Sequence, residues 1–330
     1  MGGVHLRALR EVPGASLAAV FSNVERQLEG DLTATQGNLG RPGERFDFSA
    51  IKQYRDLSMV LGDPDIDAVD LCLPTFLHED VAVEALRAGK HVLVEKPMAL
   101  DGPGARRMIA EAKRAGRILM SAQVLRFFPE YVALRNALPG LGNVRSAFFR
   151  RRCAAPAWGG WLKDPFKSGG GAFDLLIHDV DMCLHLFGRP EAVSAVGHCD
   201  LAAGLDILHG QLFYSFGAVI VSGGWQHEGA FPFTMEYSVT TDGGTIEYNS
   251  AGRPPTLYKD TEQPLMVVAD GVVLNDGYAA EIEYFVDCCR TGQQPDRCPP
   301  SESAAAVDVM RTLLVSRERY GRKIVCSNLG

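Results

Sequence analysis

The sequence predicts an α/β protein in which a parallel sheet is followed by an α+β region with a mostly antiparallel sheet. In the first third of the chain, short apolar runs alternate with helical patterns, which is typical of a parallel sheet covered by helices on both faces. From residue 192 onward, strand-like runs are broken by glycine-containing turns with little helix between them. Because 330 residues exceed one small core, we expect two domains, residues 1–121 and 122–330.

The first domain is predicted from its strands and from the signals that begin and end its helices. Three apolar runs are predicted strands: residues 17–21, 67–73 and 91–94. A helix over residues 79–88 ends at Gly89, directly before the third strand. Asp101 is expected to cap a second helix that ends at Gly116. The segment 36–48 is rich in glycine, proline and charge, and we expect a surface loop there.

The second domain is predicted from a series of short strands and two closing helices. The expected strands span residues 192–196, 209–216, 218–223, 234–240 and 244–248. Residues 279–289 and 301–316 carry apolar residues at helical spacing, so we expect helices at the end of the chain.

The composition excludes several classes of protein. The formal net charge is −7, from 33 Lys and Arg against 40 Asp and Glu, which argues against recognition of nucleic acid through its phosphates. No stretch reaches the roughly 18 apolar residues of a membrane span, and the first residues lack the apolar core of a secretion signal. The eight cysteines show no CxxC or framework spacing, so we expect free thiols in a cytoplasmic protein and assign no metal.

Lys96 is the first candidate for a chemical role. It directly follows the predicted strand 91–94 and Glu95, at the carboxyl end of a parallel strand, where open α/β sheets bind their ligands. Pro97 restricts the backbone of Lys96 to an extended conformation and so fixes the direction of its side chain. From position alone, a lysine after a strand is more often a solvated surface charge.

A second candidate cluster lies in the predicted helix over residues 168–188. Asp174, His178 and Asp181 are spaced i, i+4 and i+7, so they share one helix face. Carboxylates beside a histidine can set its tautomer and raise its basicity, as a general base near neutral pH requires. The glycines at residues 169–171 would allow close approach of backbone to a ligand. The alternative is a capped helix with His178 satisfied in the interior.

These motifs together resemble the Gfo/Idh/MocA oxidoreductases, which are NAD(P)-dependent sugar and polyol dehydrogenases. The resemblance rests on residues 72–97 (CLPTFLHEDVAVEALRAGKHVLVEKP), 125–131 (LRFFPEY), 168–181 (SGGGAFDLLIHDVD) and 278–295. The form DLLIHDVDM is most similar to the inositol-dehydrogenase branch. The resemblance implies a Rossmann-type first domain and an open-faced sheet in the second domain, through which homodimers or homotetramers form.

The resemblance also implies roles for individual residues. Lys96 matches the lysine between nicotinamide and substrate, and Asp174 and His178 match the pair at the reacting hydroxyl, with His178 as acid/base. Asp181 matches a position that binds a substrate hydroxyl, and Arg126 and Trp161 are further candidates for the substrate pocket, although each is equally compatible with packing. The implied wall of the dinucleotide cleft comprises Pro74, Thr75, His78 and Glu95.

The sequence departs from the family at two places. The family begins with a strand running into G-x-G-x-x-G, whereas M-G-G-V-H matches only the end of that motif, with Gly2 as the third glycine. We expect that the start codon was assigned too far downstream, which would explain the absent first strand and the two absent glycines. The alternative is a truncated variant with impaired cofactor binding. Ser22 and Asn23 replace the acidic residue that holds the ribose of NAD, so NADP is expected to be tolerated or preferred, with Arg26 available to its phosphate.

The resemblance therefore implies a cytoplasmic NAD(P)-dependent dehydrogenase that acts on a secondary alcohol of an inositol or a sugar. Two alternatives stay open. One is an enzyme of the same fold that retains its NAD and breaks a glycosidic bond through transient oxidation. The other is a non-catalytic, dimeric binding protein that lost its cofactor site. Three retained polar side chains, Lys96, Asp174 and His178, argue against the second alternative.

Overall fold

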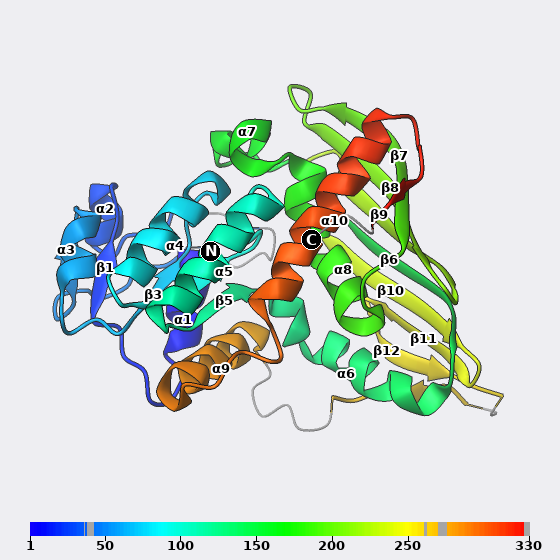
Figure 1. Cartoon of the computed structure of the whole chain (residues 1–330), viewed down its shortest axis with the longest axis horizontal. Coiled ribbons are helices and arrows are strands. Elements are labelled where there is room, and N and C mark those ends of the chain that lie inside the picture. Colours follow the sequence, from blue (N-terminus) through cyan, green and yellow to red (C-terminus); the bar gives the residue numbers. More distant parts are fainter. Residues whose placement is uncertain (36, 38–42, 261–262, 270–275, 327–330) are drawn as a thin grey trace.

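A computed structural model describes residues 1–35, 37, 43–260, 263–269 and 276–326. Helices and short parallel strands form the N-terminal part, and a broad sheet forms the opposite side of the molecule (Figure 1). The helices are α1 (Gly2–Leu9), α2 (Glu25–Leu28), α3 (Leu57–Gly62), α4 (His78–Arg87), α5 (Gly102–Ala115), α6 (Pro129–Ala137), α7 (Pro165–Ser168), α8 (Gly171–Phe187), α9 (Gly277–Thr291) and α10 (Pro300–Glu318). None of the helices within these residues is long and apolar enough to cross a membrane.

The parallel strands of the N-terminal part form two separate sheets. One joins β3 (Ala68–Leu71), β4 (His91–Glu95) and β5 (Leu119–Ala122), and the other joins β1 (Ala19–Phe21) to β2 (Lys52–Tyr54). Within the described residues, no strand connects β1 to β3.

The predicted helix signals in this region are confirmed. The Asp101 carboxylate accepts a hydrogen bond from the Gly104 backbone N–H at 2.8 Å and so caps α5. Gly116 ends the same helix with φ +63°, a left-handed conformation that favours glycine. The loop predicted over residues 36–48 lies partly outside the described residues, since 36 and 38–42 are not described.

The large sheet of the C-terminal region contains all five predicted strands and is mostly antiparallel. Its described strands follow the order β13-β12-β11-β10-β6-β9-β8-β7-β14. Their bounds are β6 (Val144–Ala154), β7 (Ala192–Asp200), β8 (Leu205–Tyr214), β9 (Gly217–His227), β10 (Thr234–Thr241), β11 (Gly244–Asn249), β12 (Arg253–Tyr258), β13 (Leu265–Met266) and β14 (Ile324–Val325). Only the pairing of β6 with β9 is parallel among the described pairs of this sheet.

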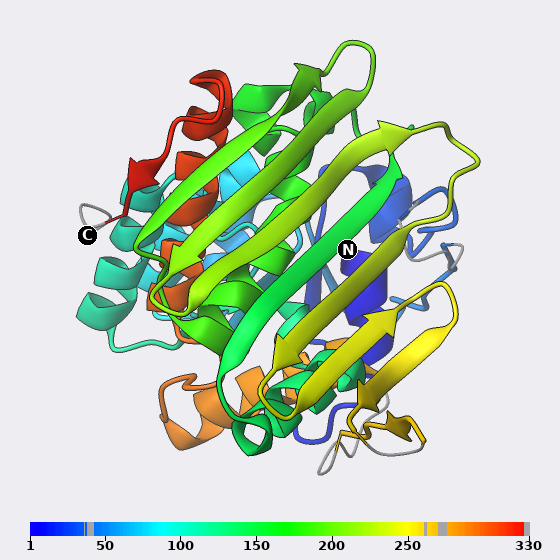
Figure 2. The same cartoon turned by 90° about the vertical axis from the view of Figure 1, so that its right-hand side faces the viewer.

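The two faces of this sheet have different surroundings. Helices α8 and α10 pack against one face and form the largest apolar core with it (Figure 1). Figure 2 shows the other face, which no helix of the described chain crosses. The sheet is therefore open on one side, as the family resemblance implied.

The end of the chain returns to the N-terminal part. Helix α9 contacts α1, and its Ile282 and Phe285 share a core with Leu93 of β4 and Met120 of β5. Helix α10 contacts α5 on one side and α8 on the other. The division into residues 1–121 and 122–330 stays a prediction.

Candidate active site

Lys96 emerges from the carboxyl end of β4, as predicted, and reaches across to α8. Its Nζ donates hydrogen bonds to the backbone oxygen of Asp174 at 2.8 Å and to Asp174 Oδ1 at 2.9 Å. Both side chains are mostly shielded from solvent. The structure thus brings together two residues that lie 78 positions apart in the sequence.

His78 supports the loop that carries Lys96. It is fully buried, and its Nδ1 and Nε2 lie 2.8 Å from the backbone oxygens of Pro97 and Leu73, respectively. Burial lowers the pKa of His78, which keeps the ring neutral and able to donate one of these two hydrogen bonds. His78 therefore holds the β3–α4 loop against the β4–α5 loop instead of facing the cavity.

Close packing at the start of helix α8 requires the glycines that precede and begin it. A Cβ at Gly171 would lie 2.3 Å from the ring of Trp225, so only glycine fits beside this indole. Gly170 has φ +94°, and the Asp206 carboxylate accepts a hydrogen bond from the Ala172 N–H at 2.9 Å. These contacts account for the glycines without a ligand, which differs from the expected approach of backbone to substrate.

His178 lies one helical turn after Asp174, on the same face of α8. Burial, followed by the charges of Lys96 and Arg151, holds the pKa of His178 well below its ordinary value of 6.5. Its Nδ1 is buried, and among the described residues it has no hydrogen-bond partner. Asp174 binds Lys96 and does not orient the imidazole. The expectation that a neighbouring carboxylate raises the basicity of His178 is therefore wrong, because burial and two cations lower its pKa.

One cavity of about 1570 Å³ connects these side chains with the predicted cofactor wall. Lys96, Asp174, His178 and Trp161 line it. The predicted cofactor residues that also line it are Gly2, Ser22, Pro74, Thr75 and Glu95. The predicted catalytic residues and most predicted cofactor contacts therefore border the same space.

The dinucleotide end of the cavity is bordered by the start of α1 and the end of β1. Gly2 and Gly3 lie in the first turn of α1, where backbone N–H groups and the helix dipole favour an anionic group. Ser22 donates a hydrogen bond to Gln27 Oε1 at 2.7 Å, and Arg26 also lines the cavity. These residues fit a dinucleotide phosphate and supply no carboxylate after β1 to repel a 2′-phosphate.

The structure does not bring Arg126 and Asp181 to this cavity. Both are fully buried, and the Arg126 guanidinium donates two hydrogen bonds to the Asp181 carboxylate at 2.7 and 2.8 Å. Arg126 also contacts Glu302 and the backbone oxygen of Arg297. Their polar groups are thus used within the protein, and neither side chain borders the cavity.

A second buried ion pair, which the sequence analysis missed, lies beside His178. The Arg151 guanidinium donates to the Asp179 carboxylate at 2.8 and 3.1 Å. Although burial lowers the pKa of Arg151, the Asp179 charge raises it above the ordinary value, so the guanidinium stays charged. Arg151 lies on β6 among three successive arginines, and such a charged run carries no local signal of burial.

We expect the free energy of unfolding of the Asp179→Ala variant to be about 3–5 kcal/mol lower than that of the wild type. The substitution leaves the Arg151 charge buried and unpaired. Chemical denaturation measures this difference. Asp287→Ala is the matched control, since Asp287 forms an exposed pair with Arg290 and its loss should change stability by about 0.5 kcal/mol or less. Equal losses in the two variants would contradict the expected importance of the buried pair.

Comparison with known proteins agrees with this fold. The family model described as an oxidoreductase family with an NAD-binding Rossmann fold matches residues 1–123. The model described as the GFO/IDH/MocA C-terminal domain matches residues 139–247. A solved aldose-aldose oxidoreductase of Caulobacter crescentus superposes with a TM-score of 0.82 over 97% of this chain and 94% of its own, at 22% identity.

Curated relatives that match large parts of the chain include two named dehydrogenases. The D-xylose 1-dehydrogenase (NADP(+)) 2 of Haloferax volcanii is 31% identical over 277 residues, which is 79% of this chain and 80% of that protein. The scyllo-inositol 2-dehydrogenase (NADP(+)) of Bacillus subtilis is 29% identical over 67% of this chain and 70% of its own length. Against three other curated relatives, the chain spans about half of their length, namely 55%, 49% and 50%.

Proposed function

The chain belongs to the GFO/IDH/MocA family of oxidoreductases with an NAD-binding Rossmann fold, and from this premise we propose that it transfers a hydride between a nicotinamide dinucleotide and a secondary alcohol of a polyol or sugar. One observation carries the proposal: Lys96, Asp174 and His178 border a single cavity that continues to the predicted dinucleotide wall. A bound nicotinamide would supply the hydride acceptor or donor.

In the direction of alcohol oxidation, His178 takes the hydroxyl proton. Its lowered pKa leaves the imidazole neutral at neutral pH, as a base requires. The Lys96 ammonium stabilises the negative charge that develops on the substrate oxygen. Asp174 holds Lys96 in place through its carboxylate and its backbone oxygen. In carbonyl reduction the same groups act in reverse.

The residues that would hold the dinucleotide are those at the other end of the cavity. Gly2 at the start of α1 would bind its phosphates, and Pro74 and Thr75 form the wall next to Glu95 and Lys96. The end of β1 carries Ser22 in place of a carboxylate, which supports use of NADP as well as NAD. The names of the xylose dehydrogenase and scyllo-inositol dehydrogenase relatives specify NADP(+).

The substrate class rests on the polar character of the cavity and on the relatives. Lys96, Asp174 and His178 offer both donors and acceptors to neighbouring hydroxyls, and Trp161 borders the same space. The motif DLLIHDVDM and the scyllo-inositol dehydrogenase relative favour an inositol, and the xylose dehydrogenase relative favours an aldose. The open sheet face in Figure 2 would serve homodimer or homotetramer assembly, and eight free thiols suit a cytoplasmic location.

The experiment that tests this proposal is a screen of inositols, other polyols and aldoses with NAD⁺ and with NADP⁺. The absorbance of the reduced nicotinamide is followed for each pair. We expect at least one polyol or aldose to reduce the cofactor catalytically, with turnover supported by NADP⁺. A complete absence of reduced cofactor across the panel would count against the proposed reaction.

The pH dependence of oxidation should reveal the environment of His178. Burial and the charges of Lys96 and Arg151 lower the pKa of His178. In the free enzyme, His178 is therefore protonated only well below pH 6.5. We therefore expect kcat/KM to remain level as the pH falls through 6.5 and to decline only at more acidic pH, since kcat/KM reports groups of the free enzyme. An acidic limb centred at or above pH 6.5 would contradict the assignment of His178 as the base.

A further inference from the structure

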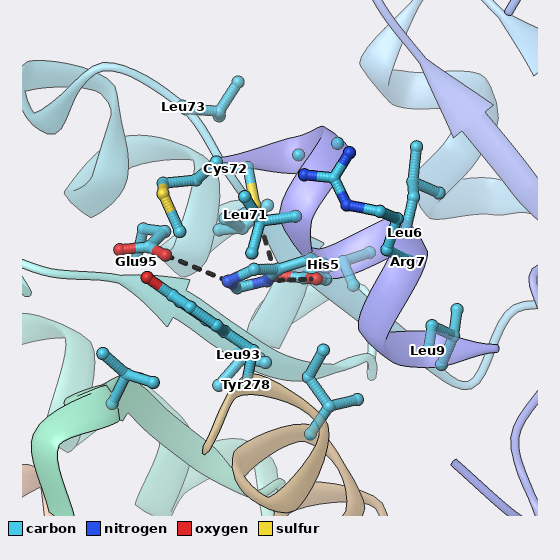
Figure 3. A pocket seen from close by; sticks show the side chains of 18 of the residues that line it. His5, Leu6, Arg7, Leu9, Leu71, Cys72, Leu73, Leu93, Glu95 and Tyr278 are labelled. Carbon is cyan, nitrogen blue, oxygen red and sulfur yellow. Dashed lines mark hydrogen bonds and ion pairs between the residues drawn. The ribbon is translucent and has the colours of Figure 1, made fainter. Parts of the chain in front are cut away.

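A cluster of possible metal ligands lies on the cavity wall at the carboxyl end of β3. We propose that His5, Asp70 and Cys72 bind a divalent transition metal ion of the Zn²⁺ type, a property that goes beyond the proposed hydride transfer. The sequence analysis assigned no metal because His5 lies 65 positions from Asp70 and no CxxC motif is present. The fold brings the start of α1 against β3 and so creates the cluster (Figure 3).

The geometry of the three ligand atoms suits one ion. His5 Nδ1 lies 2.8 Å from Asp70 Oδ2, Cys72 Sγ lies 3.7 Å from Asp70 Oδ1, and all three ligand atoms lie within 4.8 Å of one another. Ligands at ordinary Zn–N, Zn–O and Zn–S bond lengths are separated by roughly 3–4 Å in a tetrahedral site. Only small side-chain shifts are therefore needed to admit the ion.

The kinds of donor atom define the class of metal. An imidazole nitrogen, a thiolate sulfur and a carboxylate oxygen are ligands for Zn²⁺ and Co²⁺, whereas Mg²⁺ and Ca²⁺ prefer sites made only of oxygen. Asp70 and Cys72 are two positions apart at the end of an extended strand, so their side chains project to the same side. A thiolate in the set favours Zn²⁺ over hard cations.

The surroundings of His5 match those of a metal-binding histidine. Its Nε2 lies 3.0 Å from Glu95 Oε1 (Figure 3). Its Nδ1 lies 2.8 Å from Asp70 Oδ2. Metal-bound histidines usually donate their second ring N–H to a carboxylate, which fixes the tautomer and the ring orientation. His5 is only 3% exposed, and its ring packs near that of Tyr278. Glu95 is therefore the carboxylate beside Nε2, and Nδ1 is the nitrogen that would bind the ion.

The cluster is open to an incoming ion on one side. His5, Asp70, Cys72 and Glu95 all line the cavity, and the Asp70 side chain is 37% exposed. Three protein ligands leave one tetrahedral position for water or another small ligand from the cavity, as in open zinc sites. An entry path and a supporting carboxylate are thus both present.

The test is a titration of the full-length, chelator-treated chain with Co²⁺ as the spectroscopic probe, followed by displacement with Zn²⁺. We expect one Co²⁺ per chain with a thiolate-to-cobalt absorption band that Zn²⁺ removes. Cys72→Ser should lose this band, and Glu95→Gln should weaken binding about 10–100-fold. Circular dichroism confirms that the variants are folded.

Two control variants locate the ion. Cys199→Ser removes an exposed thiol on β7, and His178→Ala removes the histidine of the proposed catalytic site; both should keep the band. The proposal is overturned when no Co²⁺ binds, when Cys72→Ser keeps the band, or when either control abolishes it. Because the titration uses the metal alone, its failure leaves the proposed hydride transfer unaffected.

Discussion

The His178→Ala variant is expected to oxidise the polyol or sugar about 10²–10⁴-fold more slowly than the wild type, because it removes the base that takes the hydroxyl proton. The loss should appear mainly in kcat, since the imidazole acts on the proton that moves in the transition state. Initial rates under saturating cofactor, followed through the absorbance of the reduced nicotinamide, measure the effect.

His185→Ala is the matched control for this variant. His185 lies on the same helix seven residues later, does not line the cavity, and faces Glu302 at 3.7 Å. We expect this control to keep most of the turnover, and thermal unfolding should show both variants to be folded. Near-normal turnover in His178→Ala would refute the role of His178 as the acid/base.

The Lys96→Met variant is expected to lose about 10²–10³-fold in kcat, the usual effect of removing one donor that stabilises an oxyanion. The methionine retains the apolar stem but cannot neutralise the developing charge or bind Asp174. Lys163→Met, a substitution in the short 3-10 helix η4 (Gly160–Lys163) outside the cavity wall, is the control and should keep wild-type rates.

The same variant has a second, independent readout in its pH profile. The Lys96 charge is one of the causes that lower the pKa of His178, so its removal should raise that pKa. The acidic limb of kcat/KM should then move to higher pH in Lys96→Met than in the wild type. An unchanged limb, together with unchanged turnover, would show that Lys96 does not act on the reacting groups.

Local patterns were sufficient to predict most of the fold. The apolar run at residues 91–94 locates β4, and Asp101 and Gly116 bound α5 as expected. The central strand β6 was missed because its buried face includes Arg151, which interrupts the apolar alternation that marks a strand. The contact of α9 with α1 depends on tertiary packing, and no local pattern encodes it.

The candidate site was predictable where spacing along one element determines it. Asp174 and His178 share a face because they are one turn apart, and Lys96 follows from the end of a parallel strand. Pairings between distant elements were not predictable: Asp181 carries a carboxylate at helical spacing, but only the fold shows that it binds Arg126. The position of His5 between Asp70 and Glu95 likewise follows from the packing of α1 against β3 and β4.

The central claim, that Lys96, Asp174 and His178 support net hydride transfer from a polyol or sugar, is tested most directly by isotope transfer. The substrate found in the screen is prepared with deuterium at its reacting carbon, and the cofactor from a single turnover is analysed by mass spectrometry. We predict one deuterium on the reduced nicotinamide with the wild-type protein and far slower transfer with His178→Ala and Lys96→Met. Product formed with no deuterium retained on the cofactor, or transfer at the wild-type rate in both variants, would contradict the claim.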